Sequence, residues 1–276
     1  WLDLATIVDE IQLNIDWANT HGVAIDPTEL VTGEHSGLES LPQQPGDNPN
    51  FAPALTSTGI TSTASDNSRE TQPRQVGSAL TVPRHPMNVF YNVASRAELI
   101  DEYNWIYTTV ADGGSGICEI DPNSTCIEPL AVSEFETYLV PLETSIAMRH
   151  ITRNDPRPHY VHQSNLAEER VLLPVMDSIL GRYHAAYAAN TPIVTPSQTE
   201  AGEFLRDMAT WSDAGTAPDA RVTAYRQGDV VVVEVQGDGI DVPLTVSSAS
   251  TFGTPYGPGR SDWAALPADG SLMVPT

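Results

Sequence analysis

Apolar residues spaced three and four positions apart open the chain and predict an amphipathic helix. We place this helix at about residues 6–20, with Gly22 as a suitable C-terminal cap. Its apolar face consists of Leu4, Ile7, Val8, Ile11 and Ile15. Domains seldom begin so abruptly with an apolar helical face, so we expect the chain to be a fragment or a processed piece of a longer protein.

Short β-branched segments that run into polar loops alternate with helical patterns as far as about residue 213. We expect strands within residues 29–38, 59–69, 89–93 and 158–165, and a loop over 40–55. We expect helices over residues 95–107, 131–152, 166–189 and 196–213. Ser95 and Glu98 form the pattern of a capping box at the start of the first of these helices, and Pro141 predicts a bend in the second.

The pattern changes after residue 213. Strict alternation on both sides of Gly228 and Asp229 predicts a β-hairpin, and further strand-like segments follow it. We therefore expect an α/β domain over residues 1–213 and a small all-β domain over 214–276. Strands that alternate with helices favour a parallel sheet, in which sites lie at the carboxyl ends of strands.

Charge and composition narrow the possible partners. The chain carries 36 acidic and 13 basic residues, a net charge of −23, and all the basic residues are arginine. Such a surface repels nucleic acid and anionic membranes, so we expect neither as a partner. No run approaches the roughly 18–20 apolar residues of a membrane span, which predicts a soluble protein without membrane insertion.

The two cysteines, Cys118 and Cys126, enclose a polar loop in the segment "ICEIDPNSTCIE". We expect them to form a disulfide, which would indicate an oxidising, secreted or extracellular location. Two unrelated thiols are the alternative.

Polar side chains gather where the predicted strands end: Glu34, His35, Asp66, Arg84, His85, His159 and His162. Residues three apart on a strand point to opposite faces, so His159 and His162 are not expected to share one metal ion. His162 lies nearer to the following helix, where an imidazole is suited to proton transfer.

Each of these residues also has an ordinary structural explanation. His162 could be a hydrogen-bonded structural histidine, and Asp66 in "SDNS" could make an Asx-turn. Glu34 and His35 could form a tight turn between glycines, and Arg84 and His85 could be the polar end of a strand. His21, His150 and His184 fall in or beside helical patterns, and we expect structural or surface roles for them.

The segments "TGEHSGL", "TASDNSR", "RHPMNVFYNV", "DEYNWIY" and "RPHYVHQSNL" resemble the polysaccharide deacetylases of the NodB-homology type. The similarity is strongest to the branch of the galactosaminogalactan deacetylases and their bacterial relatives, and it runs over about residues 1–213. The resemblance implies a partial, distorted (β/α) barrel with a small C-terminal β appendage. It also implies a hydrolase that uses a divalent metal, usually zinc, and removes N-acetyl groups from an amino-sugar polymer.

By the same resemblance, His162 and Asp66 are the catalytic residues of this chain, His162 as the catalytic acid and Asp66 as the aspartate at a strand end. Glu34 and His35 would shape the substrate groove, where Arg84, His85 and His159 are further candidates for substrate contact. The family's Asp-Asp pair and its H-x-x-x-H ligands are absent here. The resemblance implies that the metal ligands lie upstream of Trp1, so we expect this chain alone to be inactive.

Two other functions remain open. The chain could be a non-catalytic carbohydrate-binding or cell-surface module on a degenerate barrel. Its aromatic residues for stacking on sugars would be Tyr91, Trp105, Tyr107 and Trp263. A glycoside hydrolase that uses Glu34 and Asp66 as paired carboxylates is the third possibility.

Overall fold

The computed structural model describes residues 1–41, 44–90, 92–216 and 221–275. The chain divides into two compact units. Unit 1 contains residues 1–83 and 188–276, and unit 2 contains residues 84–187. The long middle segment therefore forms a compact body of its own. The expected boundary between residues 213 and 214 stays a prediction.

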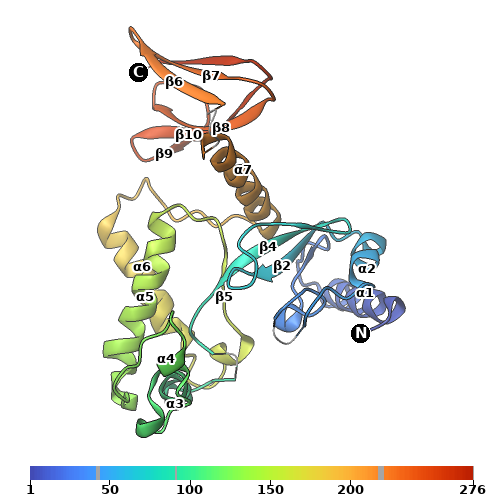
Figure 1. The fold of residues 1–276 in the computed structure, drawn as a ribbon, viewed down its shortest axis with the longest axis vertical. Coiled ribbons are helices and arrows are strands. Elements are labelled where there is room, and N and C mark those ends of the chain that lie inside the picture. The colour runs from blue at the N-terminus through green and yellow to red at the C-terminus, as the bar shows by residue number, and fades with distance from the viewer. Residues whose placement is uncertain (42–43, 91, 217–220, 276) are drawn as a thin grey trace. The chain divides into compact units, whose positions relative to one another are not determined.

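A curled, mainly parallel sheet gives the mixed α/β fold that the alternating pattern predicts (Figure 1). Its strand order is β1-β2-β4-β3, and β5 lies beside β4. The pairs β1–β2 and β4–β5 are parallel, whereas the short β3 runs antiparallel to β4. This architecture is compatible with part of a (β/α) barrel. The strands are β1 (Glu29–Leu30), β2 (Ser62–Asp66), β3 (Gln75–Val76), β4 (Ala79–Pro86) and β5 (His159–Tyr160).

The expected opening helix is confirmed as α1 (Leu4–His21). Asp3 caps its start by accepting a bond from Thr6 N, and Gly22 ends it with φ 67°. Only glycine adopts this left-handed conformation without a steric cost, which explains why the helix stops there.

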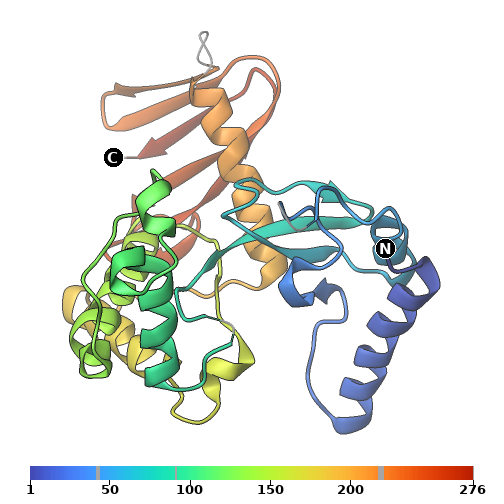
Figure 2. The same ribbon diagram turned by 60° about the horizontal axis from the view of Figure 1, so that its bottom comes forward.

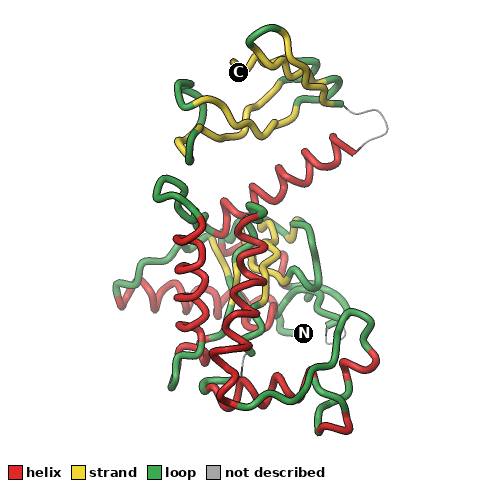
Figure 3. The backbone as a smooth tube through the Cα atoms, turned by 90° about the vertical axis from the view of Figure 1, so that its left-hand side faces the viewer, coloured by secondary structure: helices red, strands yellow, loops and turns green. Residues whose placement is uncertain are grey.

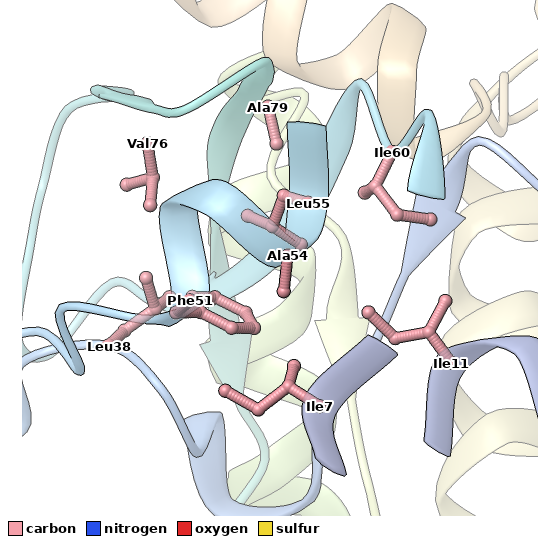
Figure 4. Close-up of a cluster of buried hydrophobic side chains, with 9 residues drawn as sticks. All are labelled: Ile7, Ile11, Leu38, Phe51, Ala54, Leu55, Ile60, Val76 and Ala79. Carbon is pink, nitrogen blue, oxygen red and sulfur yellow. The ribbon is translucent and has the colours of Figure 1, made fainter. Parts of the chain in front are cut away.

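The expected loop over residues 40–55 is wrong at its end, because helix α2 (Phe51–Thr58) begins there. Phe51, Ala54 and Leu55 are at most 2% exposed, so burial of this face drives the helix despite the proline- and asparagine-rich segment before it. Ile7 and Ile11 of α1 pack against α2 in the same cluster (Figure 4). Leu38, Ile60, Val76 and Ala79 complete it.

The expected strand at residues 89–93 is also wrong, because the strand of this region is β4, several residues earlier. Val89 and Val93 are 1% exposed and pack into the interior from a loop. Their β-branched side chains suggested a strand, but burial rather than sheet pairing accounts for them. Tyr91 lies outside the described residues.

Unit 2 consists mainly of helices (Figure 3). The capping box on Ser95 and Glu98 is confirmed at the start of α3 (Arg96–Tyr107). The expected helix over 131–152 is instead a 3₁₀ turn (Val132–Glu134), a π-helical turn (Phe135–Leu139) and then α5 (Val140–Thr152), with Pro141 in its first turn. Proline is tolerated there because the first turn has no bond for its missing N–H.

Helix α6 (Leu172–Ala186) packs beside α5 and is shorter than the expected helix over 166–189. Glu168 and Arg170 have positive φ angles of 41° and 50°, so the chain turns before the helix begins. The remaining short elements of unit 2 are 3₁₀ turns at Val110–Asp112 and Gln163–Leu166 and the helical turn α4 (Ile117–Ile120).

In unit 1, α7 (Gln198–Thr216) contacts both β2 and the C-terminal strands (Figure 2). The predicted hairpin at Gly228 is confirmed as β6 (Val222–Gln227) and β7 (Val230–Val235). Two three-stranded sheets follow, in the orders β11-β7-β6 and β8-β10-β9. The remaining strands are β8 (Ile240–Ser247), β9 (Thr254–Tyr256), β10 (Gly259–Leu266) and β11 (Ser271–Pro275), and a 3₁₀ turn spans Gly33–His35.

The expected disulfide between Cys118 and Cys126 is present, with an S–S distance of 2.07 Å. A disulfide is compatible with an extracellular protein. Within the described residues, no helix combines the length and the apolar character needed to cross a membrane.

Replacing both cysteines by serine will lower the free energy of unfolding by about 2–3 kcal/mol, because a short loop is no longer closed in the unfolded chain. Urea unfolding measures this loss. The control Asn123→Ser, in the same loop, will change stability by less than about 0.5 kcal/mol. Equal stability of the double variant and the control would contradict the structural role of the disulfide.

Gly77→Ala will destabilise the protein more than Gly22→Ala. Both glycines have positive φ, 61° and 67°, so both substitutions carry the left-handed strain of about 1–2 kcal/mol. A Cβ at residue 77 would lie 2.3 Å from Ala52 O, whereas one at residue 22 meets nothing within 4 Å. We expect an additional loss of about 1–3 kcal/mol for Gly77→Ala in urea unfolding, and equal losses would refute the clash.

Candidate functional site

The predicted site residues fall into two local groups, one in each unit. Glu34, His35 and Asp66 belong to unit 1. Arg84, His85, His159 and His162 belong to unit 2.

In unit 1, the end of β2 brings Asp66 to His35. The distance from His35 Nε2 to Asp66 Oδ2 is 3.8 Å, and each side chain is 12% exposed. Asp66 Oδ1 accepts a bond from Ser68 N, so Asp66 does make the Asx-turn that its sequence suggests. Both residues line a pocket of about 10 Å³, which is roughly the space of one water molecule. The pair is a closed contact rather than a broad binding cavity.

The backbone beside this pair has an uncommon conformation. Glu34 and His35 have positive φ angles of 50° and 55°, which non-glycine residues seldom adopt. Such conformations persist only where the surrounding structure holds them, and they are frequent at functional sites. Glu34 is exposed, whereas His35 is turned toward Asp66. The two neighbours therefore have different environments.

Arg74 joins the loops around this pair. Its guanidinium donates two bonds to Asp47, at 2.6 and 2.7 Å, and one to Glu70 at 2.6 Å. Burial acts to raise the pKa of Asp47, but the bonds from Arg74 and from Glu39 N outweigh it and hold that pKa below its usual range. The bidentate pair fixes the loop after β2 against the loop before α2.

In unit 2, three imidazoles pack together where β4, β5 and the end of α5 meet. The rings of His85 and His150 are stacked with centroids 3.7 Å apart and an interplanar angle of 11°. His150 Nδ1 and His159 Nε2 are 2.9 Å apart, a hydrogen bond between the two rings. His85 Nε2 donates to Asp155 Oδ2 at 3.0 Å. We call these four residues the histidine cluster.

The environment of the histidine cluster favours neutral imidazoles on His150 and His159. Burial lowers the pKa of His159 to about 4, and the neighbouring His150 and His85 act in the same direction. Burial, His85 and two nearby arginines lower the pKa of His150. Asp155 is also buried, but bonds from His85 and Arg157 outweigh that effect and hold its pKa well below its usual range.

The histidine cluster does not have the geometry of a metal site. The stacked rings of His85 and His150 lie face to face, and their bonded nitrogens are directed at different partners, Asp155 and His159. Metal ligands must instead converge on one point with their lone pairs. Among the residues that the structure describes, no group of three or more His, Cys, Asp or Glu side chains is arranged to hold a metal ion.

His162 follows β5 in extended backbone and is half-buried, outside the stacked rings. Its backbone N–H donates to Asn165 Oδ1 at 2.9 Å. The Asn165 amide in turn donates to Phe90 O and Val93 O, at 2.8 and 3.0 Å, and the residue is completely buried. Asn165 therefore ties the turn that carries His162 to the loop after β4.

A second buried group holds the start of that loop. The carboxylate of Glu143, 2% exposed, accepts bonds from both Asn88 N and Asn88 Nδ2, at 3.1 and 2.8 Å. It also accepts a bond from the Tyr103 hydroxyl at 3.2 Å. Burial and the charge of Glu143 raise the pKa of Tyr103, so this hydroxyl remains a donor. The loop between β4 and α3 is thus fixed at both ends.

Arg84 is 9% exposed, and its guanidinium carbon lies 4.4 Å from the centre of the Tyr160 ring. This cation–π contact joins β4 to β5 beside the His85–His159 pair. The sequence indicated no role for Asp155 or Glu143, and it assigned His150 only a structural or surface role. His162 and Asn165 are related as in a capping box, in which the third residue of the turn bonds back to the backbone N–H at its start.

Comparisons of the chain with family models, with curated proteins and with solved structures found no match.

Asn165→Ala will lower the free energy of unfolding by about 3 kcal/mol or more. The substitution leaves the buried Val93 O without its partner, which costs roughly 1–3 kcal/mol, and it removes two further bonds that contribute about 1 kcal/mol each. Chemical denaturation monitored by circular dichroism measures the loss. The exposed Asn123→Ala is the matched control, and a loss as small as the control's would show that Asn165 is not a structural anchor.

Proposed function

We propose that this chain is part of a secreted polysaccharide deacetylase that removes N-acetyl groups from an amino-sugar polymer. The proposal rests first on the sequence resemblance of five segments. It is supported by the different environments of two neighbouring histidines. The His159 ring bonds to His150 within the histidine cluster, whereas His162 lies outside that cluster on a turn held by Asn165.

Hydrolysis of an acetamide adds water across the C–N bond and releases acetate and a free amine. The nitrogen must gain a proton as this bond breaks, because an amide anion is too basic to leave. In the proposal His162 donates this proton, and Asn165 holds its backbone in place. His159 supports the site as a neighbour and does not transfer a proton.

Asp66 and His35 form a separate local group within unit 1. Asp66 carries a carboxylate at the end of β2, where the resemblance puts an aspartate of the deacetylase site. Its approach to His35 supports a role in shaping the groove rather than a role as a separate nucleophile. Glu34, which is exposed, remains a candidate for substrate contact.

The zinc ion of the resembled family needs ligands that the described residues do not supply. The proposal places those ligands, and the residue that activates water, outside this chain. No step above therefore depends on a metal held by residues 1–276.

In the protein as it occurs naturally, His162→Ala will reduce acetate release from an N-acetylated amino-sugar oligomer by about 10²–10⁴-fold. The control is His184→Ala, which changes an exposed histidine on α6. The test compares the rate of acetate release of the two variants with that of the wild type, after circular dichroism has shown that both variants fold. Unchanged acetate release in His162→Ala would falsify the proposed acid.

A carbohydrate-binding module is the second candidate, and one observation favours it. The Trp105 side chain on α3 is 54% exposed, whereas aromatic rings usually bury most of their surface. A protein that retains the polymer, releases no acetate and loses retention in Trp105→Ala would support this alternative.

A further inference from the structure

The histidine cluster joins three elements of unit 2 through side chains that respond to pH. His85 lies on β4, His159 lies opposite it on β5, and His150 lies in the last turn of α5. The strand pairing beside the cluster rests on short backbone contacts. His85 N donates to Pro158 O at 2.8 Å, and Met87 N donates to Tyr160 O at 3.2 Å.

The contact between His150 and His159 tolerates only one hydrogen. Across 2.9 Å, one of the two ring nitrogens must donate and the other must accept. The two facing nitrogens therefore share a single proton. A proton on both facing nitrogens removes the acceptor and sets two N–H groups against each other. Two charged rings stacked 3.7 Å apart, as His85 and His150 are, would also repel each other.

The surrounding charges oppose further protonation. Arg84 adjoins the cluster from β4, Arg149 and Arg153 from the end of α5, and Arg157 from the turn that follows. Asp155, the acidic member of the cluster, acts in the opposite direction on His150 and His159, but it already bonds both His85 and Arg157. Tyr160, the remaining titratable neighbour on β5, stacks on Arg84.

We propose that His85, His150, His159 and Asp155 form an acid-released latch that holds β5 against β4 and α5. The latch is closed while the imidazoles of His150 and His159 are neutral, and protonation of these rings opens it. This inference is independent of the proposed function, because it concerns only how unit 2 holds its own strands together.

The direction of the pH effect follows from the folded and unfolded states. His150 and His159 take up protons less readily in the closed state, whereas in the opened chain they regain the ordinary histidine pKa of about 6.5. The latch therefore contributes fully above about pH 6.5. Its contribution falls as the pH drops from there to about 4, the pKa of His159 in the closed state, because the open state binds more protons. Asp155 stays ionised across this interval.

Amide hydrogen exchange tests the latch in the chain itself. The reporters are the N–H groups of His85 and Met87, which bond to β5, and the internal reference is the helical amides of α6. Protection factors, corrected for the pH dependence of intrinsic exchange, will fall for the reporters by up to about a hundredfold per pH unit between pH 6.5 and 4.5, about tenfold for each of the two rings that takes up a proton. The α6 amides will keep their protection over the same interval.

His150→Gln is the diagnostic variant, because a glutamine amide can still bond to His159 but cannot be protonated. In this variant we expect the logarithm of the reporters' protection factors to fall with decreasing pH at most half as steeply as in the wild type. The matched control His184→Gln changes an exposed histidine on α6 and will keep the wild-type slope.

Three results would overturn the latch. The first is unchanged reporter protection down to pH 4.5, and the second is a parallel loss in α6. The third is a wild-type slope in His150→Gln. If His150→Gln does not fold, NMR titration of the wild-type imidazoles decides, because the latch requires His150 and His159 to titrate below the ordinary histidine pKa of about 6.5.

Discussion

Two backbone hydrogen bonds between β4 and β5 are the constraint on which the candidate site of unit 2 depends. They set His85 opposite His159 and Pro86 opposite Tyr160. Because β5 has only two residues, this pairing cannot persist on backbone bonds alone. The cation–π contact of Arg84 with Tyr160 and the stacked imidazoles supply the missing side-chain contacts. The position of the turn that carries His162 follows from this arrangement.

Buried polar groups, together with the buried side chains of Val89 and Val93, define the shape of this region. Asn165 and Glu143 each satisfy several backbone or side-chain groups of the loop between β4 and α3. A buried polar group with all of its bonds made is stable and also specific, since no other arrangement satisfies the same partners. The loop thus keeps one conformation although it contains little regular structure.

In unit 1, polar side chains also hold loops together. Arg74 connects two loops through carboxylates, and His35 approaches Asp66 despite an unfavourable backbone conformation. In a chain with a net charge of −23, the Arg74 guanidinium neutralises carboxylates that would otherwise repel one another.

The sequence by itself determined features that depend on neighbours along the chain. The cap of α1 at Gly22, the capping box on Ser95 and Glu98, the hairpin at Gly228 and the short disulfide loop all follow from local chemistry. The tertiary structure decided the features that need distant partners. Helix α2 forms because its apolar face meets α1, and His150 joins His85 and His159 because helix and sheet converge. Local pattern carries no information about such contacts, since the free energy that stabilises them comes from burial and bonding between segments far apart in the sequence.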